Sequence, residues 1–464
     1  MASASTAGSV DPFSTLLPLP ADIPAWLAVS QGIQRLVAEA KLATGDKLPA
    51  ERTLAQLLGL SRTTITHAYE NLAKLGWVEA RQGSGTTVRV PTTDRRPSLP
   101  LVPGGDSPTI DLATAAGFAP PATAALIDQA LTWLPRSLAS AGYEPFGLPY
   151  LREQIAAWHT GRGLPTDPNQ VIVTAGALAG FSTVLHALAG PAPRVAVDDP
   201  TYLGALAALG AVKAKPAAVP LGPAGWDLDR WEDTLRRDRP ALAYLMPDFH
   251  NPTGLSLDPG VRRDLMRRCA RHGCVPVVDE ATSPLELDGP LPELRYAGDD
   301  PRTVTLSSLS KVLWAGLRIG WIRAPHSLIA PLRDQQVRLG FGAAVLDQLV
   351  AEAFFDNPAP VVAEVLDALR ATRAAWAAGL ADQLPDWNAP QPSGGVALWV
   401  TLPEPCADRL AVAAAARDLT IVPGLRFFTG PGGDNRLRLP LTLPAATVPE
   451  AVTRLRATWD ATVG

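Results

Sequence analysis

The sequence predicts two folded domains of different class, a small α+β domain followed by a much larger α/β domain. Helical patterns and two short strands fill the chain before residue 90, whereas strands and helices alternate from residue 110 onward. A stretch rich in proline and glycine separates the two patterns and is expected to be a semi-stiff linker. We therefore divide the 464 residues into a flexible N-terminus (1–22), a small domain (23–90), a linker (91–109) and a large domain (110–464).

Composition excludes several classes of protein. The net charge of −4 gives no overall attraction to nucleic acid or membranes, so any DNA binding must come from a local patch. Cys269, Cys274 and Cys406 are too few for a disulfide framework and lack the partners of a metal site, so we expect core thiols in a reducing cytosol. The sequence shows no signal peptide and no apolar stretch of spanning length. We expect a cytoplasmic protein without a membrane partner.

The small domain carries the signals of a helix-turn-helix. A helix is expected over residues 50–58, and Gly59 after it suits a left-handed C-cap. Ser61 is expected to cap a second helix over residues 62–75, so a glycine-containing turn joins two short helices. The first turn of such a second helix reaches base edges when the helix enters the major groove. A small helical domain that binds protein is the alternative.

Two predicted strands, residues 77–81 and 86–90, complete a wing. The segments Leu-Pro-Ala-Glu-Arg-Thr-Leu-Ala, Leu-Ser-Arg-Thr-Thr-Ile and Gly-Trp-Val-Glu-Ala-Arg-Gln-Gly-Ser-Gly make residues 30–90 resemble the GntR-type winged helix. Arg62 suits bidentate pairing with guanine, which discriminates bases by ~1–3 kcal/mol. The resemblance implies an operator in double-stranded DNA as partner, contacted by Arg52, Ser61, Arg62, Thr63, Thr64 and, at the wing tip, Gly83.

Lys311 is the most informative residue of the large domain. It is one of six lysines in a chain whose cations are nearly all arginine. Unlike a guanidinium, an amine can lose its proton near neutral pH and form a Schiff base with an aldehyde. Ser308 and Arg318 stand close by in sequence and suit a phosphate. The pattern predicts a pyridoxal 5′-phosphate (PLP) site, and an exposed helix lysine is the alternative.

Other residues at the ends of predicted strands fit the same cofactor. Asp279 closes an apolar strand, where an unpaired carboxylate is costly, and it would hold the pyridine nitrogen protonated. Asn251 can donate to the ring phenolate, and Tyr202 can stack on the ring. Gly176 and Ala177 lie where a strand turns into a helix, whose N-terminus suits a phosphate. Taken singly, a turn explains Asn251 and a helix cap explains Asp279.

The order of these motifs resembles the fold-type I aminotransferases over residues 110–445. That resemblance implies an arginine for the ligand carboxylate near the C-terminus, with Arg438 a better match than Arg436. An aminotransferase-like domain behind a winged helix resembles the MocR family of GntR regulators. The family pattern implies a homodimer, with each head on the partner's body, and transcriptional control by PLP or a PLP–amine adduct.

The chain departs from the family pattern at three places. Ala281 and Thr282 stand where many relatives have a tyrosine that tunes the bound cofactor. The phosphate turn, residues 175–178, lacks the usual hydroxyl and glutamine, and Gly204 replaces an arginine of some amine-sensing relatives. The site therefore keeps the groups needed to hold PLP but lacks side chains that favour rapid transamination.

Three hypotheses follow from the sequence. The first is a transcriptional regulator that binds PLP as an internal aldimine on Lys311 and senses PLP, an amine or an amino acid. The second is an active aminotransferase with an accessory DNA-binding domain, which an intact Arg438 permits and the missing tyrosine disfavours. The third is a repressor whose large domain only dimerises, against which the retained lysine weighs.

Overall fold

The computed structural model describes residues 12–19, 23–38, 42, 46–74, 77–81, 85–88, 109–289 and 302–463. Gly83, most of the predicted linker, and residues 1–11 and 20–22 of the predicted N-terminal segment lie outside the described residues. Within that segment, Pro12–Leu16 form the 3-10 helix η1, and Phe13 is buried in the core of the small domain. This short piece is therefore ordered by apolar packing, which its Ser- and Pro-rich composition did not indicate.

The small domain is a winged helix. Gly59 adopts the left-handed conformation with φ of 67°, and the Thr64 amide donates to Ser61 Oγ over 3.1 Å, so both predicted caps are present. The strands pair in antiparallel fashion, and this domain has an apolar core of its own. Its elements are α1 (Ala25–Ala38), α2 (Glu51–Leu58), α3 (Arg62–Lys74), β1 (Val78–Arg81) and β2 (Gly85–Val88).

A seven-stranded sheet in the order β4-β10-β9-β8-β7-β5-β6 forms the centre of the large domain in its described residues. β10 is antiparallel to both neighbours, whereas β9, β8, β7, β5 and β6 run parallel. The carboxyl ends of the parallel strands therefore meet at one edge, where ligands bind in such folds. The strands are β4 (Val171–Thr174), β5 (Arg194–Asp199), β6 (Lys215–Pro220), β7 (Leu242–Leu245), β8 (Val275–Asp279), β9 (Val304–Ser308) and β10 (Gly320–Arg323).

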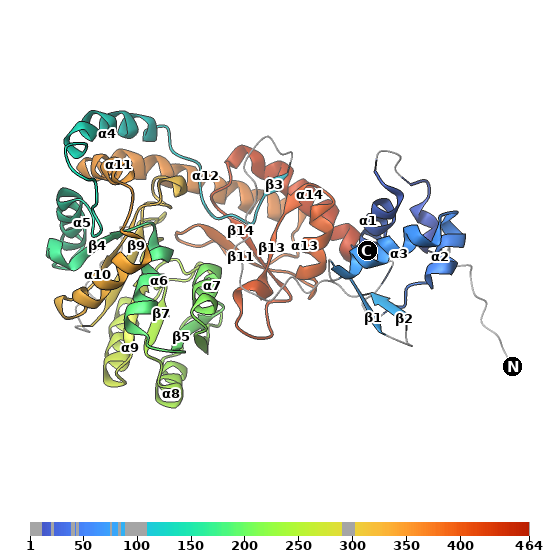
Figure 1. Cartoon of the computed structure of the whole chain (residues 1–464), viewed down its shortest axis with the longest axis horizontal. Coiled ribbons are helices and arrows are strands. Elements are labelled where there is room, and N and C mark those ends of the chain that lie inside the picture. The colour runs from blue at the N-terminus through green and yellow to red at the C-terminus, as the bar shows by residue number, and fades with distance from the viewer. Residues whose placement is uncertain are drawn as a thin grey trace.

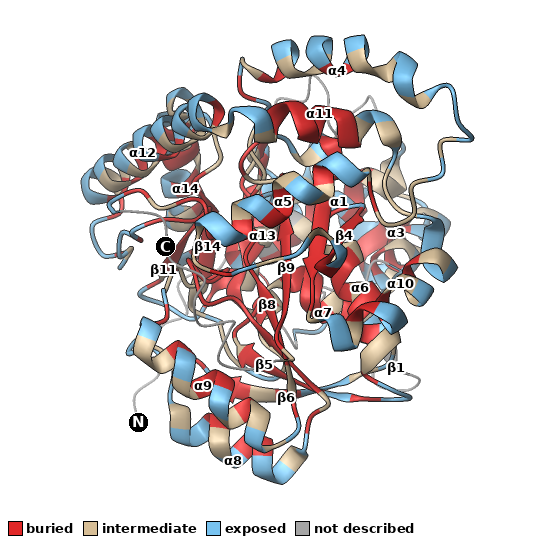
Figure 2. Ribbon diagram, turned by 90° about the vertical axis from the view of Figure 1, so that its left-hand side faces the viewer, coloured by how far each residue is buried: buried red, intermediate tan, exposed pale blue. Residues whose placement is uncertain are grey.

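Helices cover both faces of this sheet, because successive strand residues point to opposite sides. Val195 and Val197 pack with α6 on one face, while Ala196 packs with α8 and α9 on the other. Figure 2 shows the buried residues concentrated in the strands and in α11, with exposed residues along α8. The helices are α4 (Thr123–Ser137), α5 (Pro149–Gly161), α6 (Ala177–Leu188), α7 (Leu203–Ala211), α8 (Leu228–Asp238), α9 (Pro259–Arg271), α10 (His326–Gly340) and α11 (Val345–Asp356).

The last part of the chain adds a smaller α/β unit around the antiparallel sheet β11-β14-β13. The strand β3 (Ile110–Asp111), which directly follows the predicted linker, pairs in parallel with β12 of this unit. In Figure 1, α1 of the winged helix lies beside α13, which it contacts. The elements of this unit are α12 (Pro358–Gln383), β11 (Ala397–Thr401), α13 (Ala407–Ala415), β12 (Leu419–Thr420), β13 (Val422–Pro423), β14 (Arg436–Pro440) and α14 (Val448–Val463), with 3-10 turns η5 (Gly424–Phe427) and η6 (Ala445–Thr447). Two further 3-10 turns, η2 (Pro168–Gln170) and η4 (Ala315–Leu317), stand next to strands of the seven-stranded sheet.

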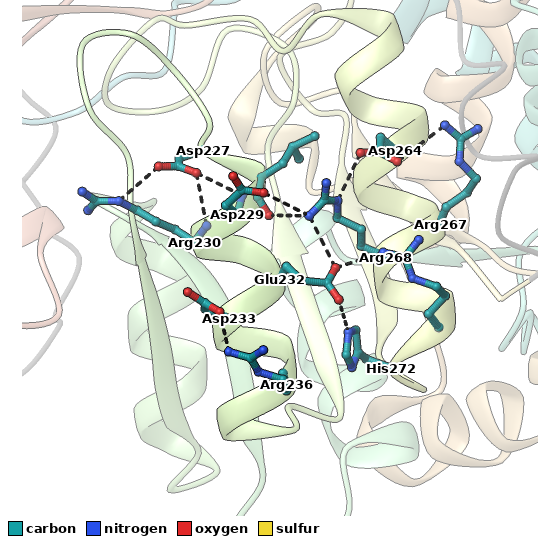
Figure 3. A network of polar contacts seen from close by, with 12 residues as sticks. Asp227, Asp229, Arg230, Glu232, Asp233, Arg236, Asp264, Arg267, Arg268 and His272 are labelled. Atoms are coloured by element: carbon teal, nitrogen blue, oxygen red, sulfur yellow. Dashed lines mark hydrogen bonds and ion pairs between the residues drawn. The ribbon is translucent and has the colours of Figure 1, made fainter.

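A network of charged side chains joins α8 to α9 on the surface (Figure 3). Arg268 reaches Asp264 and Glu232, and His272 contacts Glu232 over 2.6 Å. Ion pairs of this exposed kind contribute little to stability. The described residues contain no group of His, Cys, Asp and Glu that could hold a metal, and none of their helices is long and apolar enough to cross a membrane.

Candidate DNA-binding and cofactor sites

The start of α3 presents its first turn to solvent. The Arg62 side chain is 75% exposed, and its Nε donates to Glu51 Oε2 of α2 over 3.1 Å. Thr66 Oγ1 donates to the same carboxylate oxygen over 2.9 Å. Arg52, Ser61 and Thr63 are exposed as well, and Thr64 is half-buried, with its hydroxyl oxygen 2.8 Å from Ser61 Oγ.

Lys311 lies in the turn after β9, rather than on a helix. Its Nζ donates to the Ala115 carbonyl over 2.6 Å. Burial, with the nearby charges of Arg438 and Arg318, lowers the pKa of this amine to about 8, and Asp279 opposes the shift. About a tenth of the amine is therefore unprotonated at pH 7, far more than for an ordinary lysine, and this fraction can act as a nucleophile.

Asp279 ends β8 and is 6% exposed. Its Oδ1 accepts from the Ala281 amide over 2.9 Å, and its Oδ2 accepts from the Tyr244 hydroxyl over 2.7 Å. Burial raises the pKa of this carboxyl, whereas the two hydrogen bonds and the Lys311 charge lower it. A buried carboxylate with two donors and free lone pairs suits a cationic ring nitrogen.

The turn between β4 and α6 meets the Arg318 side chain. Gly176 has a φ of 99°, and a Cβ there would come within 2.8 Å of the Arg318 guanidinium. Arg318 Nη2 donates to the Ala175 carbonyl over 2.8 Å. Ser308 Oγ lies 2.6 Å from Ser310 Oγ, so a second hydroxyl, which the sequence analysis did not select, joins the first. A helix N-terminus, an arginine and hydroxyls together suit a phosphate.

Tyr202 lies among the charged groups of this site. Burial raises the pKa of the Tyr202 phenol, and nearby Asp279, Arg438 and Arg318 also act on it, which places these groups close together. A Cβ on Gly204 would lie 2.4 Å from Tyr202 Cε1, so the ring occupies the space that a side chain at 204 would need. The side-chain oxygen of Asn251 is buried without a hydrogen-bond partner.

Arg436 and Arg438 are two residues apart on β14 and therefore point to the same face of the sheet, opposite different residues of β11, Thr401 and Trp399. Arg438 is 4% exposed and donates to the Ala113 carbonyl, and burial lowers the pKa of its guanidinium to about 10. Arg436 instead donates to Thr401 Oγ1. Of these two arginines, Arg438 is the one whose charge acts on Lys311 and Tyr202.

These side chains fit PLP. The Lys311 amine suits its aldehyde, Asp279 its ring nitrogen, and the Gly176 turn with Arg318 and Ser308 its phosphate. Asn251 is buried, and its side-chain amide nitrogen is the group that could donate to the ring phenolate. PLP supplies an electron-withdrawing ring when bound, and the protein supplies orientation and charge.

Two family models match the chain. The model for aminotransferase class I and II matches residues 125–455, and the model for bacterial regulatory proteins of the gntR family matches residues 27–88. The chain belongs to the aminotransferase class I and II family and carries a GntR-type domain before it, which is the architecture of the MocR-type regulators. The fold class and the PLP cofactor predicted from the sequence are thereby confirmed.

Relatives share this whole architecture. YdcR of Escherichia coli, an uncharacterized HTH-type transcriptional regulator, is 27% identical over 87% of this chain and 92% of its own length. PdxR of Corynebacterium glutamicum, an HTH-type pyridoxine biosynthesis transcriptional regulator, is 29% identical over 90% and 91%. The large domain is similar to the crystal structure of LysN, the α-aminoadipate aminotransferase of Thermus thermophilus, in complex with N-(5′-phosphopyridoxyl)-L-leucine. The TM-score is 0.69 and the identity 27%, covering 76% of this chain and 93% of LysN.

The structure also adds site residues that sequence reasoning missed. Tyr244 donates to Asp279, and a hydroxyl within the apolar run of β7 is the sequence signal that could have found it. The carbonyls of Ala113 and Ala115 accept hydrogen bonds from Arg438 and Lys311, respectively. No sequence signal marks such a main-chain acceptor. The MocR-type site is thus assembled from side chains and from the first segment after the linker.

Proposed function

We propose that this MocR-type protein is a PLP-dependent transcriptional regulator of the cytoplasm that senses PLP, an amine or an amino acid. Its winged helix binds operator DNA, and its large domain holds PLP covalently on Lys311. The names of YdcR and PdxR, which match most of the chain, support regulation as its role. The proposed cofactor contacts are Lys311, Asp279, Asn251, Tyr202, Gly176, Ala177, Ser308 and Arg318, with Arg438 for an effector carboxylate; the proposed DNA contacts are Arg52, Ser61, Arg62, Thr63, Thr64 and Gly83.

One observation carries the proposal that ligands are sensed. The segment that continues from the linker, residues 111–117, receives hydrogen bonds from both site cations, Lys311 at the Ala115 carbonyl and Arg438 at the Ala113 carbonyl. This segment is itself fixed by β3 pairing with β12, and by Asp111 Oδ1, which accepts from the Ala113 amide over 2.7 Å. The chain leading to the DNA-binding domain is therefore attached to the two groups that would receive the ligand.

Ligand binding would change both attachments. Condensation of the Lys311 amine with the PLP aldehyde would release water and leave Nζ with fewer N–H groups to donate to the Ala115 carbonyl. A carboxylate on the effector would compete with the Ala113 carbonyl for Arg438, and a charged acceptor is the stronger one. Such a change would supply the differential contact that any ligand-controlled switch requires.

The test is DNA affinity for the protein's own upstream region at fixed salt, because phosphate contacts make affinity salt-dependent. The protein is compared without ligand, with PLP, and with N-(5′-phosphopyridoxyl)-L-leucine. We expect the ligands to shift the affinity several-fold, and equal affinity in all three states would refute the sensing role. Lys311→Ala is expected to abolish the response to PLP and the pyridoxyl group that borohydride fixes on the protein.

Movement of the segment can be observed directly. Thr114 is exposed while the cysteines Cys269, Cys274 and Cys406 are buried, so Thr114→Cys allows selective labelling with a fluorophore. The label should respond to N-(5′-phosphopyridoxyl)-L-leucine more than to the same compound without its carboxylate. A label at Ala224→Cys, in an exposed loop before α8, serves as control. Equal responses to the two compounds would remove Arg438 from the sensing scheme.

Arg438 beside Lys311 also favours a second function, transamination, as the name of LysN indicates for that protein. We place sensing first because Ala281 and Thr282 provide no phenol after Asp279. Turnover of an amino acid with a keto acid, well above the rate with free PLP, would reverse this order. Half-transamination alone would not reverse the order of the two functions.

Exposed apolar side chains support a homodimer. Leu138 is 72% exposed, Tyr143 74% and Phe341 57%, and the rings of Tyr143 and Phe341 lie 5.6 Å apart. A patch of this kind on a single chain is typical of a protein–protein interface. Light scattering should give twice the mass of the chain, and Phe341→Asp should shift it toward the monomer.

A further inference from the structure

A buried tyrosine on β7 reaches the carboxylate that ends β8. Tyr244 is 1% exposed, and its hydroxyl donates to Asp279 Oδ2 over 2.7 Å. The parallel register pairs Tyr244 with Val277, so Tyr244 and Asp279 point to the same face of the sheet. The Tyr244 ring packs against Phe181 of α6 with centroids 4.7 Å apart. Core packing therefore fixes the phenol in the position from which it donates.

The surrounding charges keep this contact in one protonation state. Burial, and next the Asp279 charge, raise the pKa of Tyr244 well above its usual value, with smaller contributions from Tyr202 and Asp198. The phenol therefore stays protonated and remains a donor. Burial alone would favour a neutral Asp279, but the hydrogen bonds from Ala281 and Tyr244 and the Lys311 charge favour the carboxylate. Tyr244 thus contributes to the ionisation of Asp279 as well as to its orientation.

We propose that Tyr244 is a positioning residue that holds the Asp279 carboxylate ionised and correctly turned, and thereby sets the protonation of the PLP ring nitrogen. This inference rests on the PLP site of the proposed function. A carboxylate oxygen has two lone pairs, so Oδ2 can accept from the Tyr244 hydroxyl and from the ring N–H together. Because Ala281 and Thr282 offer no phenol after Asp279, the protonation of the cofactor would be controlled from the side of the ring nitrogen, through Asp279 and Tyr244.

The experiment uses the full-length protein loaded with PLP that is ¹⁵N-labelled at the ring nitrogen. Tyr244→Phe keeps the ring and removes only the hydroxyl. We expect the nitrogen resonance to move toward its unprotonated position, and the Kd for PLP, measured by absorbance, to rise about tenfold. An unchanged resonance together with an unchanged Kd would overturn the proposal.

Tyr69→Phe is the matched control. Tyr69 is also buried, at 6% exposure, and its hydroxyl donates to the Pro49 carbonyl over 2.8 Å, but it lies in the winged helix. It should leave the nitrogen resonance and the Kd for PLP unchanged. In an Asp279→Asn background, Tyr244→Phe should have no further effect, because the group it acts through is gone. A full additional effect there would show that Tyr244 acts only on packing.

If Tyr244→Phe does not fold, 3,5-difluorotyrosine at position 244 keeps the hydroxyl and makes it a stronger donor. The ring nitrogen should then become more fully protonated, and no change in its resonance would refute the proposal. None of these measurements contains DNA. A regulator that fails to respond to PLP in DNA binding can still show the Tyr244 effect, so the two failures are distinguishable.

Discussion

At the scale of single residues, the site depends on the ionisation of Lys311. Burial lowers the pKa of its amine to about 8, aided by Arg438 and Arg318. Below that pH the amine is mostly protonated and cannot attack the aldehyde. We predict that the rate of covalent PLP capture by the ligand-free protein rises about tenfold per pH unit below pH 8 and levels off above it. Stopped-flow absorbance from pH 6 to pH 10 measures this profile.

A rate that keeps rising toward pH 10.5 would mean that the pKa of the Lys311 amine is not lowered. Arg438→Gln is the informative companion, since the Arg438 charge is the second cause of the lowered pKa. Its profile should level off at a higher pH than that of the unchanged protein. Lys311→Arg keeps the charge, loses the nucleophile, and should capture no PLP.

Gly204 matters because of the ring beside it. A Cβ at this position would lie 2.4 Å from Tyr202 Cε1 and 2.7 Å from its hydroxyl oxygen. We predict that Gly204→Ala displaces the Tyr202 ring and weakens PLP binding about tenfold, through the lost stacking contact. Absorbance titration measures this. Gly161→Ala, at a helical glycine with open space around its Cβ, should leave PLP affinity unchanged.

At the scale of elements, two helices cooperate in presenting Arg62. Glu51 at the start of α2 accepts from Arg62 Nε and from Thr66, both on α3. This contact engages Nε while the Arg62 side chain stays 75% exposed. We predict that Arg62→Ala costs ~1–3 kcal/mol in operator affinity, as expected for a lost base contact. PLP affinity should not change.

Glu51→Gln separates orientation from contact. Without the ion pair, the Arg62 side chain gains freedom, so discrimination between operator variants should fall more than affinity for nonspecific DNA. Gln56→Ala, at an exposed position of the same helix, should change neither property. Operator binding that is unaffected by both Glu51→Gln and Arg62→Ala would place the recognition surface elsewhere.

The elements predicted from the sequence are those with local signals. Gly59 marks the end of α2 and Ser61 the start of α3, and the start predicted for α3 matches the structure. Strand ends at Asp279 and the turn at Gly176 were found for the same reason. Pairing between β3 and β12 was not foreseen, because it joins segments about 300 residues apart that carry only two residues each. The hydrogen bonds to the Ala113 and Ala115 carbonyls depend on that pairing and were missed with it.

At the scale of the whole molecule, the chain has separate apolar cores. The winged helix is built on one core, which includes Leu54, Ile65 and Leu72, and none of its members belongs to the cores of the large domain. Domains with their own cores are able to unfold separately. Segment 111–117 follows the predicted linker from the winged helix, and α1 of the winged helix contacts α13 of the large domain. Scanning calorimetry should therefore resolve two transitions.

PLP should then act unequally on the two transitions. A ligand at one hundred times its Kd stabilises the domain that binds it by ~2.7 kcal/mol, so the large-domain transition should move up by a few degrees. If the changed hydrogen bonding at the Ala113 and Ala115 carbonyls is transmitted through the linker, the temperature of the winged-helix transition should rise as well, by a smaller amount. With Lys311→Ala, neither transition should respond in this way. A winged-helix transition that ignores PLP, while the large domain is stabilised, would mean that the site and the DNA-binding domain are energetically independent.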